Sequence, residues 1–354
     1  MRWRCLLFTI VAGILLVVGG DAAAELPRYQ RLNVLIYSEY MDPNITKLFE
    51  KETGIKVVID TYESTDEMMV KLQRGNGVNN YDLIVATDYM VPVLAKRQMI
   101  QPLEHSNIPN IRNISKTFMN PSYDRENVYS LPYQWGTVGV MYRDDLMPKV
   151  NPTWGLIFNP DLQPGPFVLI NSMRDLIGAA LKYQGHSFNS RKKAELENAE
   201  KLIIATRNNK KYSGFDGSVG GKNKILTGDV TAAIVYNGDA IRAMKKDKRV
   251  GFIVPKEGSI LWVDVMAVTV GAINWGGAHA FINFILKPKI GAMLSDFNRF
   301  ATPNAASLPL VRKQDRQDQG IYPSTAVMKK MEFMEDVGKD NELYVKAWKA
   351  IKSN

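Results

Sequence analysis

Strand-like and helix-like patterns alternate along most of the chain, and this alternation restricts the fold more than any other feature. Apolar runs at 31–38, 55–62 and 81–87 have the length and composition of buried strands. A helical pattern separates the first two runs, with Asp42 as its expected N-cap and Gly54 at its end. The order strand, helix, strand, helix, strand is typical of an α/β fold, in which helices cover both faces of a mostly parallel sheet.

The same alternation starts again after an apolar stretch at 129–143, which is longer than an ordinary strand and could cross between two lobes. A strand is expected at 166–171, followed by helices at 172–183 and 191–207. The glycine-rich segment 214–224 reads as a flexible loop, because it lacks residues that a phosphate-binding loop requires. With 354 residues, the chain can form two cores. We therefore expect two α/β lobes with a ligand cleft between them.

The first residues have the pattern of an export signal. Two arginines precede an apolar run, and Ala22 and Ala24 offer a small-residue cleavage point. The run is shorter than the roughly 20 residues that a membrane-spanning helix needs. We expect residues 1–24 to be a signal peptide that is cleaved near Ala24. Cys5, the only cysteine, lies inside this segment, so the mature chain would have no disulfide.

Several classes of function are disfavoured by the composition. The formal net charge of +9 would permit a nucleic-acid or membrane-surface role, but the basic residues are scattered and are not interleaved with aromatic ones. The three histidines are isolated, without metal-ligand spacing, and no nucleophile elbow or dinucleotide fingerprint occurs. We expect no nucleic-acid partner, no metal, no cofactor and no catalytic residue.

Acidic or polar side chains stand beside aromatic ones at the ends of several predicted strands. Asp264 is the sharpest case, because it interrupts the apolar run 260–268 and a buried carboxylate costs several kcal/mol without a partner. Each cluster alone could be a helix cap or a core aromatic. Together they suit an organic ammonium ion, since carboxylates accept its hydrogen bonds and rings cover its methylene groups. The clustered residues are Tyr37, Ser38, Glu39, Tyr40, Thr87, Asp88, Tyr89, Ser172, Asp175, Tyr236, Asp239, Trp262 and Asp264.

These stretches give the chain a resemblance to a known family. From about Leu32 onward it resembles the periplasmic spermidine/putrescine-binding proteins of bacterial polyamine ABC transporters, in segments such as YDLIVATDYMV, LPYQWGTVGV, YNGDA, KEGSILWVDVMAV and ATPNAA. The resemblance implies a two-lobed periplasmic-binding-protein fold that closes on a linear polyamine. It also implies an inner-membrane ABC permease as partner, a periplasmic location and a monomer. The implied lobes are 25–135 with 260–303, and 136–259 with 304–354.

The resemblance also implies ligand contacts, one position at a time. Trp262 and Asp264 match the family outright, and Asp175 stands where the family places a carboxylate for an ammonium group. Asp239 matches an acidic position of putrescine binders. The remaining matching positions are Ser38, Glu39, Tyr40, Thr87 and Tyr89.

Other positions depart from the family pattern. Tyr37 and Tyr236 replace tryptophans, which should weaken cation–π attraction to the ligand. Ser172 replaces an aspartate of spermidine binders, Phe300 a tyrosine and Met334 a glutamine. The loss of these polar groups favours a diamine over spermidine as the ligand. Delivery to a permease and reporting to a membrane partner, as a polyamine sensor, both fit such a site.

Overall fold

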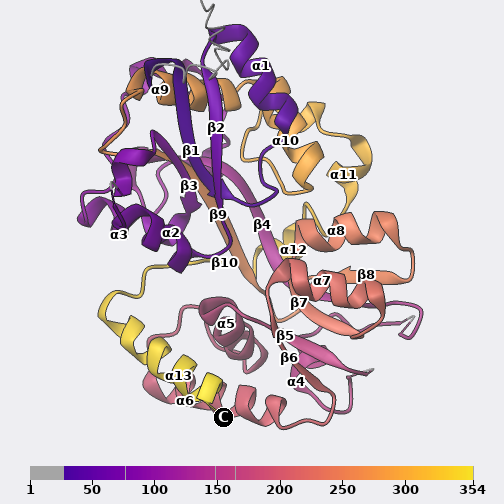
Figure 1. The fold of residues 1–354 in the computed structure, drawn as a ribbon. Coiled ribbons are helices and arrows are strands. Elements are labelled where there is room, and N and C mark those ends of the chain that lie inside the picture. The colour runs from indigo at the N-terminus through magenta and orange to yellow at the C-terminus, as the bar shows by residue number, and fades with distance from the viewer. Residues whose placement is uncertain (1–27, 76, 148, 164, 354) are drawn as a thin grey trace, which may run out of the picture.

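The computed structural model describes residues 28–353 except 76, 148 and 164, and shows two α/β halves that share one mixed sheet (Figure 1). The strand order is β2-β1-β3-β9-β4-β7-β5-β6, with β10 paired to β9 and β8 paired to β4. The expected signal peptide and Cys5 lie outside the described residues. None of the described helices has the length and apolarity needed to span a bilayer.

The first half of the molecule is built on parallel strands, as the alternation predicts. Its strands are β1 (Arg31–Tyr37), β2 (Lys56–Tyr62), β3 (Leu83–Thr87) and β9 (Ile260–Val268), and the two-residue strand β10 (Glu332–Phe333), from the C-terminal segment of the chain, pairs with the start of β9. Its helices are α1 (Pro43–Thr53), α2 (Thr65–Gln73), α3 (Val91–Lys96), α9 (Trp275–Ile285) and α10 (Pro288–Asn298). Strand β1 runs parallel to β2 and β3, whereas β9 runs antiparallel to β3.

Helix α1 begins and ends where its capping residues predict. The Asp42 carboxylate accepts the Asn44 backbone N–H at 2.8 Å, which satisfies a donor that the first helical turn leaves free. Gly54 ends the helix with φ 72°, a left-handed conformation that glycine adopts at little cost. The chain then turns into β2, so local capping interactions define both ends of this helix.

The second half has the same layered construction. Its strands are β5 (Phe167–Ile170), β6 (Tyr212–Asp216), β7 (Ala232–Tyr236) and β8 (Val250–Ile253). Its helices are α4 (Gly155–Phe158), α5 (Met173–Tyr183), α6 (Lys193–Arg207), α7 (Ser218–Thr227), α8 (Asn237–Lys246) and α13 (Asn341–Ser353). Two short helices, α11 (Lys313–Gln317) and α12 (Thr325–Met328), lie on the path from α10 to α13. Helix α13 lies beside α5 and α6 (Figure 1).

The long strand β4 (Ser130–Arg143) joins the two halves, which confirms the crossing expected at 129–143. Residues 130–137 pair with β9, and residues 138–143 pair with β7 and β8. At the crossing, a Cβ added to Gly136 would lie 2.4 Å from the Trp262 ring. Glycine therefore lets this ring lie directly against the β4 backbone.

One expectation about the second half was wrong. Segment 214–224, expected to be a flexible loop, contains the end of β6 and most of α7. Gly221 lies in this helix, and a Cβ there would be 3.2 Å from the Ala233 Cβ on β7. Close packing of α7 onto the sheet therefore outweighs the weak helix propensity of its glycines.

Candidate functional site

Asp264 is buried in the middle of the sheet, and none of the described residues supplies a cation to it. It lies on β9 between Thr87 of β3 and Gln134 of β4, and its side chain is 7% exposed. The Tyr40 hydroxyl donates a hydrogen bond to its Oδ2 atom at 2.7 Å. Within the described part of the chain, no Lys, Arg or His forms an ion pair with it. Burial raises the pKa of Asp264 to about 7, although the Tyr40 hydrogen bond lowers it somewhat.

Aromatic rings from both halves gather next to Asp264. Trp262 contacts Phe300 edge-on with ring centroids 4.8 Å apart, and Phe300 contacts Tyr40 in the same way at 5.6 Å. Tyr236 lies 5.9 Å from Trp262, and Tyr37 lies 6.0 Å from Tyr40. The indole N–H of Trp262 is buried and has no hydrogen-bond partner among the described residues. This group of rings offers several faces to a cation or to an aliphatic chain.

Asp175 forms a second buried carboxylate at the start of α5. Its Oδ2 atom accepts hydrogen bonds from the Ser172 hydroxyl at 2.7 Å and from the Tyr236 hydroxyl at 2.8 Å. Burial raises the pKa of Asp175, while these two hydrogen bonds lower it. The neighbouring Arg174 guanidinium does not pair with it, because it binds Asn189 and the Glu335 carbonyl instead. Asp175 thus also lacks an ion-pair partner among the described side chains.

The two carboxylates belong to one electrostatic environment. Burial raises the pKa of Tyr37 well above its ordinary value, and the nearby charge of Asp264 raises it further. Burial also raises the pKa of Tyr236 well above its ordinary value, and the nearby Asp175 and, to a smaller extent, Tyr37 raise it further. Tyr37 and Tyr236 therefore link the surroundings of Asp264 to those of Asp175.

Asp239 differs from these two carboxylates. It is 4% exposed, its Oδ1 atom accepts a hydrogen bond from the Arg242 guanidinium, and its Oδ2 atom accepts one from the Ser218 hydroxyl. The sequence suggested a carboxylate open to a ligand ammonium. The structure instead gives Asp239 a cation from its own helix, α8.

Other expected contacts lie at the margin of this group. Ser38 donates its backbone N–H to the Tyr62 carbonyl at 3.2 Å, and Glu39 is exposed with φ 55°. The Tyr89 hydroxyl shares a 3.1 Å hydrogen bond with Thr65. The structure places Ser38 and Glu39 at the end of β1, but shows no contact between the Glu39 side chain and the carboxylates.

Two further residues shape the site, and sequence reasoning missed the first of them, Tyr133. Tyr133 donates to the Tyr40 carbonyl at 2.8 Å, and its ring lies 5.2 Å from that of Tyr40. Asp88 is fully buried and accepts the Tyr89 N–H at 2.7 Å and the Val263 N–H at 3.3 Å. Tyr133 has no local signal in the sequence, because it acts on a partner from another part of the chain, whereas Asp88 belongs to the acidic and aromatic clusters that the sequence already indicated.

The chemistry of the site suits an organic cation. Buried carboxylates without cations attract ammonium groups, and the rings beside them can cover methylene groups. In residues 28–353, outside the three gaps, no group of histidine, cysteine or acidic side chains could hold a metal ion. The arrangement therefore points to reversible binding of a ligand with separated positive charges.

Comparison with known proteins also indicates a protein that binds a small solute. Residues 44–318 match a family model described as bacterial extracellular solute-binding protein. The chain is 30% identical to the spermidine/putrescine-binding periplasmic protein of Escherichia coli, over 94% of this chain and 95% of that protein. It is 33% identical to the putrescine-binding periplasmic protein SpuD of Pseudomonas aeruginosa, with 91% and 92% covered.

A solved structure also has this fold. The spermidine/putrescine ABC transporter substrate-binding protein PotD from Streptococcus pneumoniae superposes with a TM-score of 0.79. It is 27% identical and is matched over 91% of this chain and 99% of its own length. The two-lobed fold predicted from the sequence is thereby confirmed.

Proposed function

The chain belongs to the family of bacterial extracellular solute-binding proteins, and from this premise we propose that it captures a polyamine around Asp264 and delivers it to an ABC permease. The observation that carries the proposal is the buried carboxylate of Asp264, which has no cation of its own among the described residues. The relatives that match most of the chain bear names of polyamine-binding proteins, which supports the same ligand class.

In this proposal the two buried carboxylates each receive one ammonium group. The first binds Asp264, beside the Tyr40 hydroxyl, and the second binds Asp175. Trp262 and Tyr236 cover the methylene groups between the two charges. No bond is made or broken in such a cycle, so we assign the chain no enzymatic activity.

Binding would be coupled to movement of the two halves. We take them as the lobes 25–135 with 260–303, and 136–259 with 304–354. Proposed hinges are 134–137, where β4 passes from one half to the other, and 256–259, which precedes β9. Gly258 has φ 97° in the second hinge, a conformation that strains other residues. Rotation there would close the lobes over the ligand.

The remaining assignments follow from the family. We propose that residues 1–24 direct export and are cleaved near Ala24, so that the mature protein acts in the periplasm as a monomer. Its partner would be an inner-membrane permease, and nucleic acid has no part in the cycle.

A thermal-shift screen of the mature protein tests this function. Putrescine, cadaverine, spermidine, spermine and agmatine are each added in excess, with 1,4-butanediol as an uncharged control. An amine at 100 times its dissociation constant should stabilise the fold by roughly 2.7 kcal/mol, because it binds only the native state. The diol should have no effect. Failure of every amine to raise the unfolding temperature would contradict the proposal.

A further inference from the structure

Asp239, the third carboxylate of the site, forms an ion pair with Arg242 of the same chain. Arg242 and Asp239 lie one turn apart on α8, and the guanidinium donates to the Asp239 carboxylate. Ser218 binds the other carboxylate oxygen and also accepts the Tyr236 backbone N–H at 2.9 Å. Asp239 is therefore joined to the ring cluster through Tyr236.

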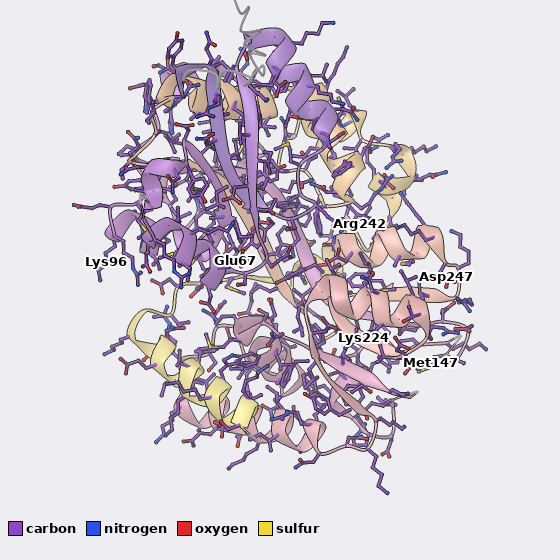
Figure 2. The ribbon with its side chains drawn as sticks, in the orientation of Figure 1. Glu67, Lys96, Met147, Lys224, Arg242 and Asp247 are labelled. Atoms are coloured by element: carbon purple, nitrogen blue, oxygen red, sulfur yellow. The ribbon has the colours of Figure 1, made fainter. Side chains whose placement is uncertain are left out.

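The guanidinium is held in the same kind of environment that a ligand ammonium needs. Its Nη1 atom donates to the Asn298 carbonyl at 2.7 Å, and its carbon atom lies 5.8 Å from the centre of the Phe300 ring. That ring in turn contacts Trp262. Figure 2 shows Arg242 on α8 at the boundary between the two halves. A carboxylate and an aromatic face thus already hold one positive charge at the edge of the site.

We propose that Arg242 determines ligand specificity by taking the place of a third ammonium group, so that the site prefers dicationic diamines to tricationic polyamines. This inference rests on the proposed polyamine function and adds to it the charge of the preferred ligand.

The balance of buried charge supports this assignment. Asp239 is paired with the Arg242 guanidinium, and the buried Asp88 accepts two backbone N–H groups, whereas Asp175 and Asp264 have no ion-pair partner among the described residues. Two carboxylates are therefore left for ammonium groups of the ligand. A diamine supplies two positive charges. A triamine brings a third, and Asp239, the next acidic side chain beside the rings, is already bound to Arg242. That third charge would lie near a guanidinium, where like charges repel.

Calorimetric titration of the mature protein with putrescine and with spermidine tests the proposal. The wild type should bind putrescine more tightly. Arg242→Gln should raise the affinity for spermidine relative to putrescine by about tenfold, the effect of one charge-assisted hydrogen bond. Arg242→Lys retains the charge and should retain the preference for putrescine, which a purely steric role of Arg242 would not predict.

Two further variants keep the test decisive. Arg242→Gln leaves Asp239 buried and unpaired and could unfold the protein. Asp239→Asn makes the opposite change, because it leaves the guanidinium unpaired, and it should disfavour spermidine still further. Arg143→Gln removes an arginine from an ion pair with Asp145 at the far end of β4, and should leave the ratio of affinities unchanged.

The outcomes separate this inference from the proposed function. A wild type that binds spermidine as tightly as putrescine would overturn the role of Arg242, and so would an unchanged ratio in a folded Arg242→Gln protein. If Arg242→Gln does not fold, an unchanged ratio in Asp239→Asn would overturn it. Binding of neither amine by the wild type would instead refute the polyamine function itself.

Discussion

Asp264→Asn is expected to weaken putrescine binding by at least about 2 kcal/mol, or roughly thirtyfold, because the ligand ammonium loses its charged partner. The substitution keeps the size of the side chain and can still accept the Tyr40 hydrogen bond. Titration calorimetry on the mature protein measures the loss. Asp60→Asn is the matched control, because Asp60 lies on β2 and pairs with Lys71 outside the site.

The same variant should be more stable than the wild type when no ligand is present. Because burial raises the pKa of Asp264 to about 7, the folded protein binds this proton more tightly than the unfolded chain does. Wild-type stability should therefore fall as the pH rises from about 4 to about 7, and then stay level. At pH 8 the variant should gain roughly 1 to 4 kcal/mol, and at pH 4 the two proteins should differ little. Weaker binding together with lower stability at pH 8 would indicate a structural role for Asp264.

Putrescine affinity should depend strongly on pH below neutrality. Asp264 has a pKa of about 7 without ligand, and a bound ammonium group would lower this pKa. Binding then requires loss of a proton below pH 7, and the affinity should fall by up to about tenfold per pH unit. Between pH 8 and pH 5 we expect a loss of about 100-fold, measured by titration calorimetry.

Asp264→Asn provides the control for this pH dependence. The variant should have a flatter profile, and the remaining slope would come from Asp175, whose pKa is also raised by burial. Titrations of the wild type near pH 6, in buffers of different ionisation enthalpy, should show that protons are released from Asp264 and Asp175 when putrescine binds. The variant should release fewer protons, because only Asp175 remains. A wild-type affinity that is constant from pH 5 to pH 8, or an equal slope in the variant, would contradict the account.

The sequence was most informative where structure depends on neighbouring residues. Asp42 and Gly54 predicted both ends of α1. The apolar run around Asp264 predicted β9, and the carboxylate within that run pointed to the candidate site. These features depend on caps, prolines and burial patterns, which a single sequence displays.

The sequence was less informative where distant segments decide the outcome. Helix α7 forms despite its glycines because Gly221 packs closely against β7. Tyr133 supports Tyr40 from another strand, which no spacing reveals. The Arg242–Asp239 pair has the spacing of helical neighbours, but the sequence analysis predicted no helix where α8 forms.

A crystal structure of the mature protein with putrescine tests the central claim most directly. We expect one ammonium nitrogen within about 3 Å of an Asp264 carboxylate oxygen and the other within the same distance of Asp175, with aromatic rings along the carbon chain. A putrescine-soaked crystal with no amine at Asp264, or with this carboxylate paired to a lysine or arginine of the protein, would contradict it.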